Sequence, residues 1–161
     1  MTPDIRAHKL ELYGQAHAIL TDALARFPRE MWTFKPADGW SIHQIVVHIT
    51  DSEANSFVRA RRCIAEPGEP VMAYDENAWS TALRYEDQST EDAVELFRWL
   101  RHNTYNLIKT LPESTCSNPI DHPEKGILTL DDWLDTYARH VPDHVEQMER
   151  CYEKWKAPND E

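Results

Sequence analysis

Apolar residues recur at steps of three and four positions over four long stretches of the chain, which is the spacing of one buried helix face. The first stretch starts at Thr2, a residue favoured at helix N-caps, and ends at Pro28. The second starts at Ser41, where Ser41 and Gln44 have the S-x-x-Q spacing of a capping box, and continues to about Ala65. These signals predict two long amphipathic helices.

Two further helices are predicted in the second half of the chain. The third covers residues 89–111, and its expected buried stripe includes Leu96 and Phe97. The fourth covers residues 129–156, although Pro142 lies inside it. Because proline lacks a backbone N–H and its ring clashes with the preceding turn, we expect a kink at this position.

The connections between these helices suggest the topology. Residues 66–88 form a connection that can cross the end of a bundle, with one short helix expected near 75–83. Residues 112–128 are expected to be irregular, since no segment of the chain has a convincing strand pattern. The sequence therefore predicts an all-α four-helix bundle, in a single domain over residues 1–161, with a frayed tail from 157 onward.

Charge and cysteine content narrow the function. The chain has 17 basic and 28 acidic residues and a net charge of −11, which disfavours nucleic acids and anionic membranes as partners. It contains no apolar stretch of membrane-spanning length and no secretory signal pattern. Its three separated cysteines suit a reducing compartment. We expect a cytoplasmic protein that acts on a small molecule.

Histidine is the main chemical signal in the sequence. His140 and His144 lie four positions apart, so both imidazoles project from one helix face. His48 falls in an apolar run, where an unpaired imidazole is costly. The alternative is a core histidine satisfied by one hydrogen bond. Three imidazoles from two helices fit an open, catalytic type of metal site. Of the others, we expect His43 to face solvent and His122 to lie in a loop.

Two familiar helical metal motifs do not occur. An H-E-x-x-H protease site requires glutamate after the first histidine, and position 141 is valine. Di-iron bundles use Glu-x-x-His pairs, but no glutamate stands three positions before His48, His140 or His144. A Ser-His-acid triad stays open as an alternative, although there is no G-x-S-x-G elbow.

Polar side chains follow His48 along one face of the second helix. Asp51, Ser52, Asn55 and Arg59 come three, four, seven and eleven positions later. This order suits a pocket with a metal ion at one end and an anionic group of a ligand at the other, or else a hydrated helix face. Asp51 is the one candidate catalytic group, as a proton acceptor or as a partner that orients an imidazole.

Tyr74 and Trp79 follow the proline-rich connection. They are candidates for a pocket wall, with aromatic core anchors as the alternative, and Asp75 between them is an expected N-cap. With Asn55 and Arg59 they form the predicted substrate-binding set.

Three segments carry a resemblance to a known family. They are GWSIHQIVVHITDSEANSFVRAR in the region 39–62, YDENAWS at 74–80 and YARHVPDH at 137–144. Together with the helix plan, they resemble the DinB-like superfamily of bacterial metal-binding four-helix bundles. Within it they are most similar to the YfiT-type branch, which includes proteins assigned as metal-dependent hydrolases and bacillithiol transferases.

The resemblance implies a metal site and a class of reaction. It implies that His48, His140 and His144 are ligands of zinc or nickel with open, water-filled positions, and a homodimer is the assembly that members often form. It also implies a low-molecular-weight thiol as cosubstrate. Pro142, which lies between two of the ligands, departs from a regular helix and should alter the geometry of the site.

Three functions remain open at this point. The first is a metal-dependent thiol S-transferase, in which Arg59 holds an anionic part of the thiol. The second is a metal-dependent hydrolase with Asp51 as the nearest proton acceptor. The third is a non-enzymatic module that binds a metal, a ligand or a protein partner, because the fold by itself does not specify catalysis.

Overall fold

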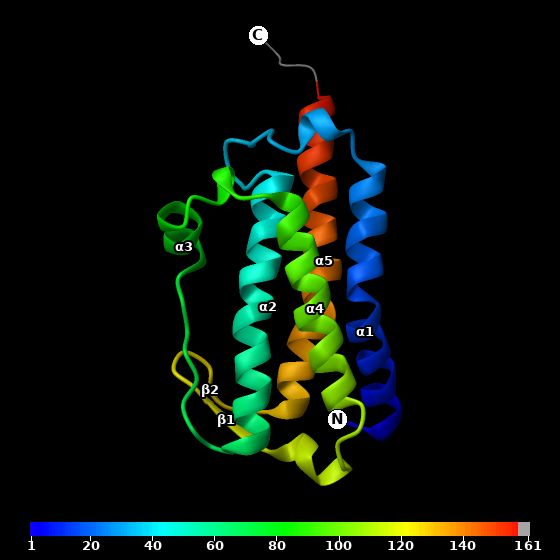
Figure 1. Ribbon diagram of the computed structural model, residues 1–161, viewed down its shortest axis with the longest axis vertical. Coiled ribbons are helices and arrows are strands. Elements are labelled where there is room, and N and C mark those ends of the chain that lie inside the picture. The colour runs from blue at the N-terminus through cyan, green and yellow to red at the C-terminus, as the bar shows by residue number, and fades with distance from the viewer. Residues whose placement is uncertain (158–161) are drawn as a thin grey trace.

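The computed structural model describes residues 1–157, so most of the predicted frayed tail lies outside the described residues. Four long helices pack side by side (Figure 1), and they are α1 (Pro3–Arg26), α2 (Ile42–Ala65), α4 (Thr90–Ile108) and α5 (Leu130–Lys156). The shorter elements are the helix α3 (Glu76–Ala82), the 3₁₀ helices η1 (Arg29–Met31), η2 (Tyr85–Asp87) and η3 (Glu113–Ser117), and the strands β1 (Pro119–His122) and β2 (Gly126–Thr129). The predicted four-helix bundle with a short extra helix is confirmed.

Side-chain caps begin the helices where the sequence predicts them. In the capping box of α2, Ser41 Oγ accepts from the N–H of Gln44, while Gln44 Oε1 accepts from the N–H of Ser41. Thr129 and Asp132 form a second capping box at the start of α5. These bonds satisfy backbone N–H groups that have no partner within the helix. The two capping boxes stand at the starts of α2 and α5, the two helices that carry the candidate ligands.

The helices do not follow a simple up-down order. Both α1 and α2 pack against α4 and α5, which places α1 and α2 diagonally across the bundle. The chain passes down α2, returns along the outside through α3 and passes down again in α4 (Figure 1). Consequently α2 and α4 are parallel neighbours, as are α1 and α5. The crossover predicted for residues 66–88 is confirmed, and it extends along the length of the bundle.

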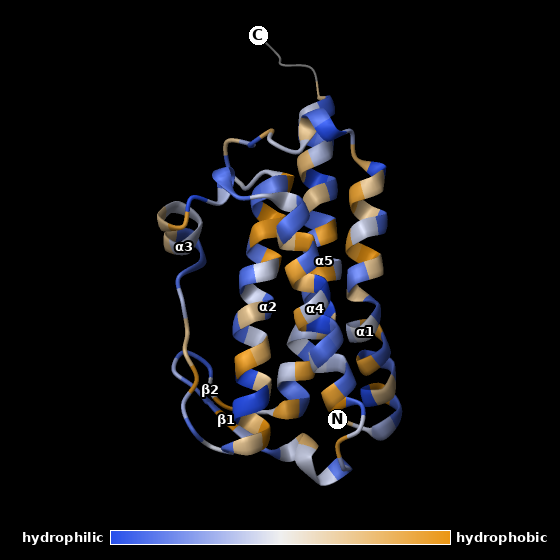
Figure 2. Ribbon diagram, in the orientation of Figure 1, coloured by the Kyte–Doolittle hydropathy of each residue, from blue (hydrophilic) through white to orange (hydrophobic). Residues whose placement is uncertain are grey.

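The core lies between the helices, where their apolar faces meet. Figure 2 shows apolar residues recurring at intervals along each long helix. Phe97 and Ile45 are completely buried, and burying a side chain of this kind contributes roughly 1.5–3 kcal/mol. The prediction for Leu96 is wrong, because this side chain is 52% exposed. Adjacent helix positions point about 100° apart, so Leu96 cannot share the buried face with Phe97.

Within residues 1–157, no helix is long and apolar enough to span a membrane.

A short antiparallel hairpin replaces part of the segment expected to be irregular. Strands β1 and β2 pair from Pro119 opposite Thr129 to His122 opposite Gly126. Gly126 has φ of 73°, a left-handed conformation that glycine adopts at little cost. The N–H of Val71 donates to the carbonyl of Asp121, which ties the crossover segment to β1. The prediction of no strand is therefore wrong, and the hairpin and crossover form one layer beside α2.

The core contains a charged network. The Arg101 guanidinium donates to Glu53 Oε2 at 2.6 Å, and the Tyr13 hydroxyl donates to Glu53 Oε1 at 2.7 Å. Arg101 also donates to the backbone carbonyls of Tyr13 and Tyr137. All three residues of the network are at most 1% exposed. This network joins α1, α2, α4 and α5 below the candidate ligands.

We expect Asp131→Asn to destabilise the protein and to weaken its response to acid. The carboxylate of Asp131 accepts two hydrogen bonds from Arg6, at 2.7 and 2.8 Å, which lower the pKa of Asp131 below its ordinary value of 3.8. A carboxylate whose pKa is lower in the folded than in the unfolded state stabilises the folded protein when the pH is above the unfolded-state pKa. This stabilisation is lost as the pH falls through the folded-state pKa. We expect the variant to lose about 1.5–3 kcal/mol at pH 7.

Urea unfolding from pH 7 down to pH 3 measures this effect. The difference between the wild-type protein and Asp131→Asn should shrink as the pH falls, because the wild-type carboxylate then becomes protonated as well. A difference that stays constant over the whole range would contradict an electrostatic role for Asp131.

Candidate metal centre

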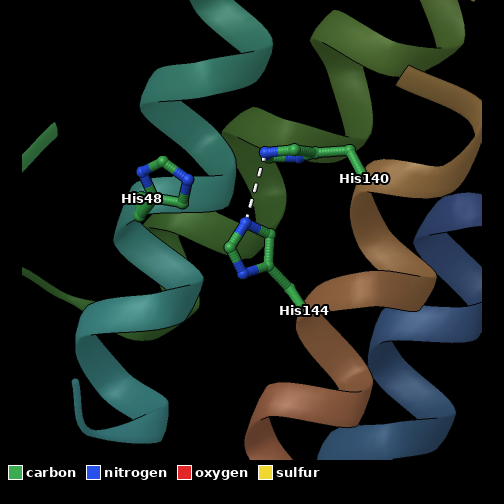
Figure 3. A group of neighbouring side chains, drawn as sticks. All are labelled: His48, His140 and His144. Carbon is green, nitrogen blue, oxygen red and sulfur yellow. Dashed lines mark hydrogen bonds between the residues drawn. The ribbon is translucent and has the colours of Figure 1, made fainter. Parts of the chain in front are cut away.

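Three imidazoles meet between α2 and α5 near the middle of the bundle. His48 projects from α2, and His140 and His144 project from successive turns of α5 (Figure 3). Their ring centroids lie 5.5 Å apart for His48–His140, 4.8 Å for His48–His144 and 4.5 Å for His140–His144. One ligand nitrogen of each residue lies within 4.8 Å of the other two. The structure therefore brings together the three histidines that the spacing selects.

Pro142 does not separate the two histidines of α5. The helix continues without interruption from Leu130 to Lys156, with Pro142 inside it. Nε2 of His140 lies 3.2 Å from Nε2 of His144 across this turn. The two ring nitrogens converge even though one backbone N–H is missing between them.

Burial keeps these imidazoles in the form that binds metals. Burial, followed by the nearby His144, lowers the pKa of His48 to about 3. Burial also lowers the pKa of His140 well below its ordinary value, with further contributions from His144 and His48, and it lowers the pKa of His144. At neutral pH all three rings are therefore uncharged, and each has a nitrogen lone pair available.

The hydrogen bonds of the three rings fit a metal ion between them. Nδ1 of His144 lies 2.8 Å from Oε1 of Gln147, which accepts its proton, so Nε2 of His144 carries a lone pair and faces Nε2 of His140. Nε2 of His140 lies 3.3 Å from Oγ of Ser52. Nδ1 of His48 is buried and has no hydrogen-bond partner among residues 1–157. Nε2 of His48, and not this Nδ1, points toward the other two rings (Figure 3), so the tautomer fixed by Gln147 is the feature that fits a bound cation.

Asp51 lies close to the histidines in sequence, but its carboxylate is used elsewhere. Oδ2 of Asp51 accepts from the Tyr85 hydroxyl at 2.7 Å. Within the described part of the chain, no hydrogen bond joins Asp51 to any of the three imidazoles. Tyr85 is completely buried, so this bond fastens η2 to α2.

The ring of Trp40 packs against the ring of His48, with the two ring centroids 4.9 Å apart.

A cavity of about 210 Å³ opens beside His140. Arg59 crosses one wall, where its Nη1 donates to the Tyr137 hydroxyl at 2.9 Å and its Nε donates to the carbonyl of Met72 at 3.1 Å. Other residues with polar groups that line the cavity are Ser52, Tyr74, Glu76, His122, Lys125, Trp133 and Thr136. The hairpin and the crossover segment therefore supply part of the cavity lining.

The predicted substrate-binding residues are divided between two hollows. Arg59 and Tyr74 line the cavity beside His140. Asn55 and Trp79 line a neighbouring groove, which Arg59 also borders. Asn55 Nδ2 donates to the carbonyl of Asp51 within α2. The ring centroids of Tyr74 and Trp79 lie 4.4 Å apart, so the two hollows are neighbours.

Several residues of the site were not predicted. Gln147 stands three positions after His144, and residues at this spacing are neighbours on a helix. Glutamine is too common in helices for this spacing alone to identify it as a partner of His144. His122 and Lys125 reach the cavity through a hairpin that the sequence does not reveal. The prediction that His43 faces solvent is wrong, because its ring bonds the carbonyl of Tyr85 at 2.9 Å and the hydroxyl of Thr90 at 2.7 Å.

Solved structures give an independent comparison of the fold. The structure of YfiT from Bacillus subtilis, described as a candidate metal-dependent hydrolase with an unusual four-helix bundle topology, superposes with a TM-score of 0.88. The match covers 96% of this chain and 90% of YfiT at 22% sequence identity, which supports a shared fold.

Sequence comparisons agree with this result. YfiT of Bacillus subtilis is 30% identical over 108 residues, which are 66% of this chain and 61% of YfiT. A relative from Oceanobacillus iheyensis is 26% identical over 107 residues, which are 66% of this chain and 62% of that protein. Both relatives are named as candidate metal-dependent hydrolases, and the matched region spans about three fifths of their length. The sequence profile of the DinB superfamily matches residues 12–148, and the chain therefore belongs to the DinB superfamily.

Proposed function

We propose that the protein is a metal-dependent enzyme in which His48, His140 and His144 bind one divalent cation, zinc or nickel. The observation that carries this proposal is the group of three neutral imidazoles with ligand atoms within 4.8 Å of one another. Three imidazoles leave at least one coordination position open, as in catalytic zinc sites. A cation held by uncharged ligands keeps its full charge and, when bound, lowers the pKa of a thiol or a water at the open position.

Thiol S-transfer is the reaction that fits these residues best. In this reaction the thiol sulfur forms a bond to an electrophilic carbon, the leaving group departs with its bonding electrons, and the thiol proton passes to solvent. Hydrolysis instead needs a base within hydrogen-bond reach of the attacking water. Asp51, the predicted base, is engaged by Tyr85, and no carboxylate of residues 1–157 is hydrogen-bonded to the three imidazoles. A thiol needs less assistance because it loses its proton more easily than water.

Hydrolysis is the second candidate, and one structural observation favours it. The carboxylate of Glu76 lines the cavity beside His140. Glu76 is exposed overall, but partial desolvation beside the cavity raises its pKa above the ordinary value, which makes this carboxylate a stronger proton acceptor. The names of the relatives point to the same chemistry.

Parallel assays on zinc-loaded and nickel-loaded protein separate these reactions. We expect conjugation of a chromogenic aryl halide with bacillithiol, mycothiol or glutathione. We also expect His140→Ala to slow this reaction at least about a hundredfold, since a metal Lewis acid contributes several kcal/mol to the transition state. A panel of nitrophenyl esters and anilides measures hydrolysis in the same samples.

Two variants make the comparison specific. His102→Ala, which removes an exposed histidine of α4, should retain full activity. Glu76→Gln should retain conjugation if thiol transfer is the reaction and should abolish ester cleavage if hydrolysis is. Loaded protein that binds thiols without converting any electrophile or ester would contradict both reactions and indicate a binding module.

A further inference from the structure

The cavity beside His140 has donors that the protein leaves unused. His122 is 7% exposed, and its Nδ1 accepts from the N–H of Glu124 at 3.2 Å. A neutral imidazole that accepts at Nδ1 carries its proton on Nε2. That Nε2–H has no hydrogen-bond partner among residues 1–157, and His122 lines the cavity. A buried polar side chain is therefore held in place with a free donor.

A second unused donor comes from the crossover segment. The hydroxyl of Tyr74 is buried and has no hydrogen-bond partner within the described chain, although its residue lines the same cavity. Burial raises the pKa of Tyr74 to about 12, so the hydroxyl keeps its proton at neutral pH. Buried polar groups without partners are rare in native proteins, and the Tyr74 hydroxyl is one of them, at a cavity that His122 also lines with a free donor.

Two permanent cations border the same space. Arg59 uses three of its N–H groups for Tyr137 and Met72, which fixes the guanidinium and leaves two N–H groups free. Lys125 stands at the turn of the hairpin on the cavity rim. A cavity with two cations and two neutral donors is complementary to an anionic oxygen group.

We propose that this cavity binds the carboxylate or phosphate group of a small-molecule ligand, through His122, Tyr74, Arg59 and Lys125. The proposal rests on the proposed function only for the role of that molecule as a substrate. The hairpin then determines specificity, since His122 and Lys125 both come from it. Glu76 also lines the cavity and Glu124 adjoins His122, so these carboxylates oppose binding and set its strength.

Calorimetric titration with succinate, inorganic phosphate and the neutral amide succinamide tests the proposal. We expect at least one anion to bind with a Kd below roughly 10 mM and succinamide not to bind. Lys125→Gln should weaken binding about two- to fivefold, as for an exposed charge. His122→Ala should weaken it roughly tenfold or more, as for a hydrogen bond to a charged group. Glu76→Gln should tighten it, and Lys109→Gln, on a distant exposed lysine, should have no effect.

The same titrations on His48→Ala separate the cavity from the proposed metal site. Binding that persists in this variant and is weakened by Lys125→Gln supports the cavity even if no thiol transfer is found. Preference for succinate identifies a carboxylate ligand, and preference for phosphate identifies a phosphate ligand. The proposal would be overturned if neither anion binds. It would also be overturned if Lys125→Gln and His122→Ala both bind the anion as tightly as the wild-type protein. Loss of binding in His48→Ala alone would overturn it as well, because the anion would then require the metal.

Discussion

Purified protein is expected to contain about one zinc or nickel ion per chain, and the His48→Ala variant is expected to contain none. His48 is the only one of the three imidazoles that comes from α2, so its removal leaves two ligands on a single helix. His144→Ala should lose the ion as well. Elemental analysis of untagged protein after dialysis measures the content directly.

A variant with an intermediate effect distinguishes a metal ligand from a residue that only orients a ligand. Gln147→Ala removes the oxygen that holds the tautomer of His144 but leaves all three imidazoles in place. We expect this variant to bind the ion with an affinity about 10–100-fold lower, measured by competition with a chelator. His102→Ala provides a control histidine on the surface of α4. Full metal content in His48→Ala would show that the ion binds elsewhere.

Replacing Arg101 with methionine is expected to cost about 3–5 kcal/mol of unfolding free energy. The substitution leaves the carboxylate of Glu53 buried without its guanidinium partner, and Tyr13 alone remains to donate to it. An unpaired buried charge is far more costly than a missing surface contact. Urea unfolding of metal-free protein at pH 7 measures the loss.

Two further variants test this reasoning. Arg101→Met combined with Glu53→Gln removes both charges, and it should recover part of the stability because a neutral amide is cheaper to bury. Arg98→Met breaks the exposed ion pair with Glu95 on the same helix and should cause no measurable loss. Equal losses for Arg98→Met and Arg101→Met would contradict the role of the buried pair.

Local signals were sufficient to predict the helices and the histidine group. Caps such as Ser41 act within a few residues, so the sequence reveals where a helix begins. His140 and His144 share a face through helix geometry alone, and the apolar surroundings of His48 turn it inward. These conclusions require no knowledge of how distant segments pack.

The cavity required information that no local pattern contains. The hairpin has strands of four residues, and its pairing to the crossover depends on contacts between Val71 and Asp121. Without that pairing, His122 and Lys125 cannot be placed beside His140. The role of Asp51 also depends on a distant segment. Its position on the helix suits a role near the imidazoles, but its carboxylate accepts a hydrogen bond from Tyr85, which comes from another part of the chain.

The pairing of α2 with α5 determines when the site can form during synthesis. His48 leaves the ribosome early, whereas His140 and His144 follow only after α4 and the hairpin have been made. Domains fold as their elements emerge, and contacts between distant segments close late. A partly synthesised chain therefore presents His48 without the two ligands of α5. The three-histidine group becomes available only when the bundle is complete, so a nascent chain does not capture metal before its core has closed.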